Sequence, residues 1–68
     1  MEKQMLKYVG KTVEIIYCGN GGSITQRRIE VQAVENHIVK AFCYQRRALR
    51  VFRIENVLAV QPVVRHAG

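Results

Sequence analysis

The sequence predicts a mostly β protein, folded as a small, strongly bent barrel of five short strands. Apolar residues alternate with a period of two along most of the chain, and short turn-like segments separate these runs. The length of 68 residues, with 49% hydrophobic residues, fits one domain spanning 1–68, near the lower size limit for a self-supporting core. We therefore expect a single β domain without an internal repeat or linker.

The N-terminal segment predicts a short helix followed by the first strand. Residues 2–8 have the apolar pattern of one or two helical turns, which Gly10 would end. The segment from Lys11 to Cys18 changes to a period of two and is rich in β-branched residues, as expected for a strand. The apolar residues of the helix are Met5, Leu6 and Tyr8, and one face of the strand holds Val13, Ile15 and Tyr17.

A glycine-rich turn leads into the second predicted strand. Residues 19–22 read Gly-Asn-Gly-Gly and give the strongest turn signal in the chain, because glycine and asparagine tolerate positive φ. The strand should run from about Ile24 to Val34 and turn back at residues 35–36. One of its sides is nearly all polar, so we expect the opposite side to face the core. That side begins with Arg27 and continues with Ile29, Val31 and Ala33.

Three further strands complete the predicted sheet, at residues 37–44, 48–53 and 57–64. A turn is expected at residues 45–47, where charges cluster, and a helical turn at residues 54–56. Pro62 fits an edge position or a strand end, because proline cannot donate to a strand ladder. Residues 65–68 are expected to form a frayed end.

The stretch from Cys43 to Val57 combines positive charge with apolar residues. Four of its arginines fall within eight positions with no acid between them: Arg46, Arg47, Arg50 and Arg53. Clustered arginines on a strand suit phosphate or carboxylate binding, because the planar guanidinium group contacts two oxygens at once. A disordered basic tail would lack the aromatic and branched residues that are present here. The residues expected to pack in the core are Phe42, Leu49, Val51, Phe52 and Ile54.

The charge of the whole chain favours polyanionic partners. The formal net charge is +6 and the pI is about 9.9, which points to nucleic acid first and to acidic proteins or membrane surfaces after it. Cys18 and Cys43 do not make a disulfide framework, so a reducing cytosol is the simpler compartment. No segment approaches the length of a membrane span. We therefore expect a cytoplasmic protein that has no contact with membranes.

Catalytic and metal-binding patterns are weak in this sequence. The only serine, Ser23, follows a glycine turn without a nucleophile elbow, and the glutamates are separated from one another. The histidines and cysteines do not have metal-ligand spacing. The glycine turn is followed by neither a lysine nor a helix start, so it reads as a hairpin turn rather than a phosphate loop. We therefore expect a protein that is not an enzyme and that uses no metal or other cofactor.

Several segments share their spacing with a known family. They are Ile15-Ile16-Tyr17, Arg27 with Ile29, Ala41-Phe42-Cys43, and Cys43-x-x-Arg46-x-x-Leu49-Arg50-x-Phe52-Arg53-Ile54-Glu55-x-Val57. Over roughly residues 13–60 the chain resembles the WYL domain, an Sm-like, SH3-type small β-barrel of bacterial transcription regulators. Three departures stand beside the resemblance: His37-Ile38-Val39 replaces the naming tripeptide, Val31 replaces a proline, and Asn56 replaces an arginine.

The resemblance implies a regulatory, ligand-sensing module. Its ligand would be single-stranded DNA or RNA, or a nucleotide-like anion, and charge-assisted contacts to phosphate would supply most of the affinity. The residues implied as binding groups are Arg27, Arg46, Arg50 and Arg53, with Tyr17 as a neighbouring aromatic. Arg50 and Arg53 alternate across the predicted strand. We therefore expect them to share one site only if the strand bends at Phe52.

Two other interpretations of this sequence remain open. The arginines could form a charged face that only confers solubility, since charge runs commonly do so. Alternatively, the domain could bind a protein partner or a second copy of itself, alongside a transcription regulator. A barrel of this size leaves strand edges exposed and has a small core, and association would relieve both.

Overall fold

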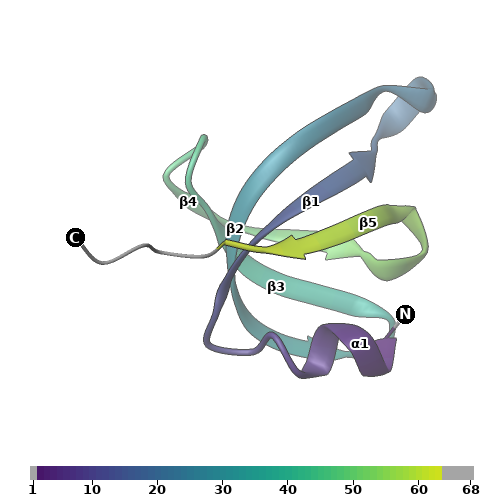
Figure 1. The fold of residues 1–68 in the computed structure, drawn as a ribbon. Coiled ribbons are helices and arrows are strands. Elements are labelled where there is room, and N and C mark those ends of the chain that lie inside the picture. The colour runs from purple at the N-terminus through teal and green to yellow at the C-terminus, as the bar shows by residue number, and fades with distance from the viewer. Residues whose placement is uncertain (1, 64–68) are drawn as a thin grey trace.

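The computed structural model describes residues 2–63 (Figure 1). The chain forms one five-stranded antiparallel sheet in the order β4-β3-β2-β1-β5, preceded by one short helix. The predicted mostly β class, with a short N-terminal helix, is confirmed. The elements are α1 (Glu2–Leu6), β1 (Thr12–Cys18), η1 (Asn20–Gly22), β2 (Ile24–Glu35), β3 (Ile38–Cys43), β4 (Ala48–Arg53), η2 (Ile54–Asn56) and β5 (Val57–Pro62).

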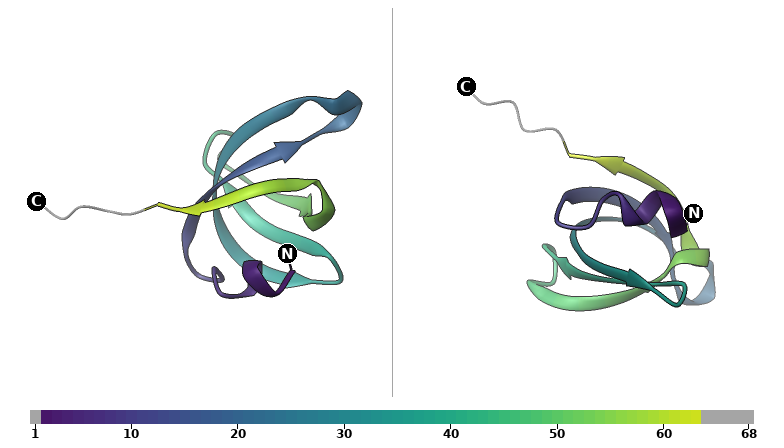
Figure 2. Two further views of the ribbon diagram at one scale, coloured as in Figure 1. Left: turned by 45° about the vertical axis from the view of Figure 1, so that its right-hand side comes forward. Right: turned by 90° about the horizontal axis from the view of Figure 1, so that it is seen from below.

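The sheet curls around a common interior, and α1 lies beside it (Figure 2). Consecutive strands from β1 to β4 pair as hairpins, and β5 returns to pair with β1. β4 and β5 are therefore the two edges of the sheet, and within residues 2–63 no ladder joins them. The 3₁₀ turn η2 connects these edges, and it lies where a helical turn was predicted. The result is a strongly bent sheet whose concave face is available for a core.

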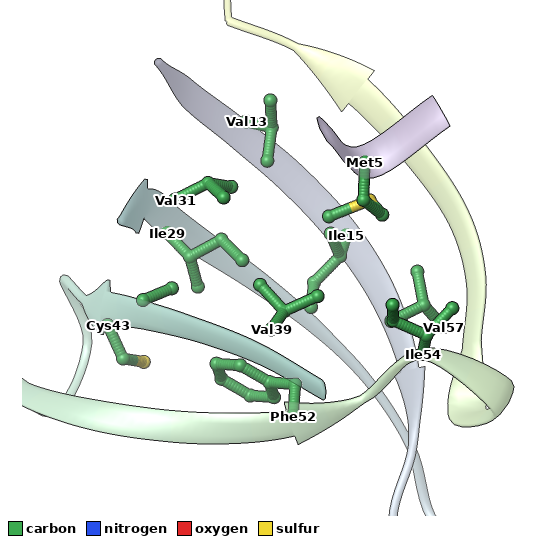
Figure 3. Packing of buried hydrophobic residues seen from close by; sticks show 11 residues of the cluster. Met5, Val13, Ile15, Ile29, Val31, Val39, Cys43, Phe52, Ile54 and Val57 are labelled. Atoms are coloured by element: carbon green, nitrogen blue, oxygen red, sulfur yellow. The ribbon is translucent and has the colours of Figure 1, made fainter. Parts of the chain in front are cut away.

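The concave face carries an entirely apolar core, to which α1 and all five strands or their connections contribute (Figure 3). Among the side chains that the structure describes, no polar or charged one is buried. Met5 of α1 is fully buried near Ile15 and Val57, so the helix covers one part of this interior. The buried residues are Met5, Val13, Ile15, Ile29, Val31, Val39, Ala41, Cys43, Phe52, Ile54 and Val57.

An irregularity in β2 reverses part of the predicted face assignment. Ile29 and Val31 are fully buried as expected, but the β2–β3 register shifts between Val31 and Ala33. After the shift Val34, not Ala33, packs against the core. A β-bulge inserts one extra residue and so moves the following side chains to the opposite face. The prediction that Ala33 faces the core was therefore wrong.

The turn between β2 and β3 lies one residue later than predicted. Its two central residues are Asn36 and His37, with φ of 51° and 62°, and β2 runs on to Glu35, which pairs with Ile38. Two central residues with positive φ match the twist of the flanking strands, as in type I′ hairpins. His37 was predicted to begin the third strand, and this was wrong.

Three residues predicted to be core residues lie at the surface or only partly below it. Leu49 and Val51 of β4 are 66% and 58% exposed, because they point to the convex face of an edge strand. Phe42 is half-buried on that face, and its ring meets the Tyr44 ring edge-on with centroids 5.4 Å apart, a favourable geometry for an aromatic pair. Leu6 of α1 is exposed as well. Alternation identified the two faces of each strand but not which face would be covered.

The last strand ends at Pro62, which pairs with Val13 at the end of the β1–β5 ladder. This matches the expectation that the proline occupies an edge strand or a strand end. The strand was predicted to continue to residue 64, and this was wrong at Val63, which follows the strand. Residue 64 and the predicted frayed end at residues 65–68 lie outside the described residues.

Candidate anion-binding site

One hollow of about 290 Å³ collects most of the residues predicted to bind an anion. Its lining residues come from the ends of β1 and β4, from β2, from the β1–β2 turn and from η2. Three arginines line it, and none of its lining residues is acidic. The lining consists of Tyr17, Gly19, Asn20, Arg27, Arg50, Val51, Phe52, Arg53 and Asn56.

Arg50 and Arg53 line the same hollow although they alternate along β4. Phe52, between them, points inward and is only 3% exposed. Arg53 is the last residue of the strand and the residue before η2, so the chain changes direction immediately after it. The two arginines alternate along the strand but line one site, because the strand ends at Arg53 and the chain turns there.

Tyr17 joins the two sides of the hollow. Its hydroxyl accepts a hydrogen bond of 3.0 Å from the backbone N–H of Arg53. Its ring meets Phe52 edge-on, with centroids 5.1 Å apart and an interplanar angle of 79°, a favourable geometry for an aromatic pair. Tyr17 therefore ties the end of β1 to the end of β4 and fixes the backbone from which Arg53 projects.

Arg27 is oriented by its neighbour on the same face of β2. Its Nε donates to the hydroxyl of Thr25 at 3.3 Å, and that hydroxyl donates to the carbonyl of Tyr17 at 3.5 Å. This arrangement leaves the two terminal nitrogens of Arg27 available for a ligand, since each guanidinium has five N–H donors. The half-buried position of Arg27 at the end of the concave face further limits its side chain.

The three arginines differ in their ionic partners. Arg53 Nη1 lies 3.5 Å from Glu55 Oε1, and both side chains are 71% exposed. Within residues 2–63, neither Arg27 nor Arg50 has a carboxylate within 4 Å. Among the residues that the structure describes, two arginines of the hollow therefore have no carboxylate partner, and the third shares its charge with an exposed glutamate.

Arg46 does not line this hollow, although it was predicted to bind with the others. It is exposed in the turn between β3 and β4, at the opposite end of β4 from Arg53. A strand rises about 3.3 Å per residue, so the length of β4 separates the two ends by roughly 20 Å. Arg46 could contact only a ligand that extends beyond the hollow.

Asn20 and Asn56 line the hollow and were not predicted as site residues. Asn20 lies in the glycine turn, and Asn56 is the last residue of η2. Their amide groups add donors and acceptors to a lining otherwise dominated by guanidinium groups. From the sequence they were interpreted only as turn residues, because their position at one hollow depends on the curl of the sheet.

A second, larger hollow of about 640 Å³ lies elsewhere on the surface, and its chemistry is mixed. It includes Glu30 among its lining residues, and its Arg28 pairs with Glu14 at 3.7 Å. An anion would be repelled by these carboxylates, so size does not make this hollow the better candidate. Its lining residues are Lys11, Thr12, Arg28, Glu30, Tyr44, Pro62 and Val63.

The described part of the chain gives no sign of a metal centre or of a membrane span. No group of three or more His, Cys, Asp or Glu side chains comes together within residues 2–63. Cys18 and Cys43 are both free thiols. No helix among the described residues is long and apolar enough to cross a membrane.

Comparison of this chain with protein-family models, with curated proteins and with solved structures finds no match. The resemblance to the WYL domain therefore stays a prediction from the sequence.

Proposed function

We propose that this domain is a non-catalytic, regulatory binding module for single-stranded nucleic acid or a nucleotide-like anion. One observation carries the proposal: Arg27, Arg50 and Arg53 line the same hollow, and none of its lining residues is acidic. Guanidinium groups bind phosphate oxygens in pairs, and such charge-assisted bonds are stronger than neutral ones. The resemblance to the WYL domain supports the same ligand class.

The dimensions of the hollow favour a single strand or a free nucleotide over a duplex. Its volume of about 290 Å³ is suited to one small group rather than to a rigid double helix. A flexible strand can place one phosphate in the hollow and let its neighbours follow the basic surface towards Arg46 and Arg47. Neither of these arginines has a carboxylate within 4 Å among the described residues.

Fluorescence anisotropy of labelled single-stranded DNA, single-stranded RNA and duplex DNA tests the proposal. We expect the single strands to bind more tightly and the affinity to fall with salt, with a log–log slope of about 0.7 per neutralised phosphate. The double variant Arg50→Ala/Arg53→Ala should lose at least about tenfold in affinity, because two charge-assisted contacts disappear.

The chain provides a matched control in Arg46→Ala/Arg47→Ala. This variant removes the same charge from the same segment but leaves the hollow intact. It should weaken binding less than the Arg50/Arg53 variant does. Absence of binding at low salt, or equal losses in the two double variants, would refute a site in the hollow.

A second candidate function is association with a protein partner or a second copy of this chain through β4. The observation that favours it is the exposure of Leu49 and Val51 on the convex face of this edge strand. An edge strand presents unpaired backbone groups to which another strand can add. Beside them, Phe42 and Tyr44 extend the apolar surface, with ring centroids 5.4 Å apart.

Sedimentation velocity across a concentration series tests this second candidate. Self-association through β4 should be lost in Leu49→Lys, which places a charge on the edge strand. Ile24→Lys is the matched control, since Ile24 is similarly exposed but lies in β2, where it pairs with Cys18 of β1 and is remote from the β4 edge. A concentration-independent monomer that captures no partner would exclude the candidate.

A further inference from the structure

The charge of the hollow selects between two kinds of phosphate. Its lining contributes three guanidinium groups and no carboxylate, and one exposed carboxylate, Glu55, lies beside Arg53. The arginines alone give a formal charge of +3, which Glu55 reduces to +2 while it pairs with Arg53. A terminal phosphate monoester carries about −1.5 to −2 at pH 7, whereas an internal phosphodiester carries one negative charge. The monoester is therefore the better electrostatic match.

The guanidinium groups of the hollow come from two strands. Arg27 belongs to β2, and Arg50 and Arg53 belong to β4. A terminal phosphate offers three unesterified oxygens to these groups, whereas a diester offers two and must continue as a chain on both sides. A hollow at the end of the sheet, with a turn on either side, suits the end of a molecule better than its middle.

The orientation of Arg27 is consistent with a prearranged phosphate contact. Thr25 accepts the Nε hydrogen bond at 3.3 Å and thereby limits rotation of the guanidinium group. Tyr17 holds the Arg53 backbone through its 3.0 Å hydrogen bond. Groups that are already ordered lose less conformational entropy on binding, which favours a compact, highly charged ligand.

We propose that the hollow binds a terminal phosphate monoester, either on a free mononucleotide or at the phosphorylated end of a single strand. The inference rests on the proposed function and narrows it from phosphate in general to the dianionic terminal group. Asn20 and Asn56, which line the same hollow, are the neutral groups placed to contact the sugar or base attached to that phosphate.

A pair of oligonucleotides that differ only at one end tests this proposal. A short labelled oligothymidylate with a 5′-phosphate is compared with the same strand bearing a 5′-hydroxyl, and the 3′-phosphate is the third probe. We expect one phosphorylated end to bind about tenfold more tightly than the hydroxyl end, the ratio expected from an added charge-assisted contact. Adenosine 5′-monophosphate should compete, and the monoanionic 3′,5′-cyclic nucleotide should compete poorly.

The dependence on pH supplies an independent readout. The second ionisation of a phosphate monoester has a pKa of about 6, so its second charge is present above that pH and is lost below it. The preference for the phosphorylated end should therefore be larger at pH 7.5 than at pH 5, while the binding of the hydroxyl-ended strand changes less.

Arg27→Gln and Arg28→Gln form the matched pair of variants. The first removes a lining arginine, and the second removes its neighbour, which points to the other face and pairs with Glu14. The preference should disappear in the first variant and persist in the second. Urea denaturation of both variants checks that each remains folded.

The outcomes separate this inference from the proposed function. Equal affinity for phosphorylated and hydroxyl ends, with the Arg50/Arg53 dependence retained, would overturn the terminal-phosphate inference and leave the anion-binding function standing. Failure of every probe to bind at low salt would overturn both.

Discussion

The concave core and the arginine-lined hollow are adjacent but chemically opposite. The core contains only apolar side chains and draws on the helix and all parts of the sheet. The hollow carries three arginines and two asparagines, and its lining residues come from β1, β2, β4 and two turns. The two regions meet at Phe52, which is buried and also lines the hollow, and at Tyr17, which packs against the core.

This division indicates that stability and binding depend mostly on different residues. The lining arginines make few contacts that hold the fold together. Within residues 2–63 their side chains form polar contacts only with Thr25 and Glu55, and the backbone N–H of Arg53 donates to the Tyr17 hydroxyl. Core substitutions should therefore lower the free energy of unfolding, and arginine substitutions should lower affinity alone. Residues at the boundary should affect both.

The largest effect is expected for Phe52→Ala, a substitution at the boundary. Loss of a buried aromatic side chain should lower the free energy of unfolding by about 3–5 kcal/mol. Because Tyr17 loses its ring partner, affinity for the anion should fall as well. Urea denaturation and anisotropy measure the two losses. Leu49→Ala is the control, since this side chain of the same strand is 66% exposed, does not line the hollow and should contribute less than about 0.5 kcal/mol.

Tyr17→Phe should produce a smaller effect on both properties. The substitution keeps the ring against Phe52 but removes the hydroxyl that accepts from Arg53 N–H. We expect a loss of about 0.5–1.5 kcal/mol in the free energy of unfolding, the usual net value of one hydrogen bond. Affinity should fall several-fold because Arg53 is less well placed. If Tyr17 acted by stacking on a base, Phe would retain full affinity.

Glu55→Gln should change binding in the opposite direction and leave stability unaffected. The substitution removes the carboxylate that competes with a ligand for Arg53. Exposed ion pairs contribute little to stability, so the urea midpoint should not move measurably. Affinity for a phosphorylated probe should rise by about two- to threefold, most clearly at low salt. Unchanged or weaker binding would show that Arg53 does not contact the ligand.

The smallest effect is expected for substitution of Arg28, which is next to Arg27 in the sequence but does not line the arginine-lined hollow. Arg28→Gln removes one exposed ion pair with Glu14 and one positive charge from the opposite face. The free energy of unfolding should change by less than about 0.5 kcal/mol. Affinity should fall only slightly, through the lower net charge, and the preference among anionic probes should persist.

The fold was largely predictable because its strands follow the alternation of apolar residues closely. β4 begins and ends at the predicted residues, and η2 occupies the predicted break. The errors lie where the backbone departs from regular geometry. The register shift after Val31 and the positive-φ turn at Asn36 have no unique signature in a period-two pattern.

The site was predictable as a set of residue types but not as an arrangement. Arg27, Arg50, Arg53 and Tyr17 were named from the sequence, and the structure places them around one hollow. Arg46 belongs to the same run of charge, yet the length of β4 separates it from the others. Asn20 and Asn56 are distant in sequence, and both line the hollow only because the sheet curls.

The pairing of β5 with β1 has a consequence for the order of folding. The ladders from β1 to β4 join strands that are consecutive in the chain, whereas the β1–β5 ladder joins the first strand to the last. Closing that long loop costs more chain entropy, so we expect the hairpins to form first and β5 to dock last. Val57→Ala should then speed unfolding and scarcely slow refolding in stopped-flow experiments, whereas slower refolding with an unchanged unfolding rate would place β5 in the nucleus. Until β5 docks, β1 remains an open edge, and the folding chain is most vulnerable to pairing with its neighbours at that stage.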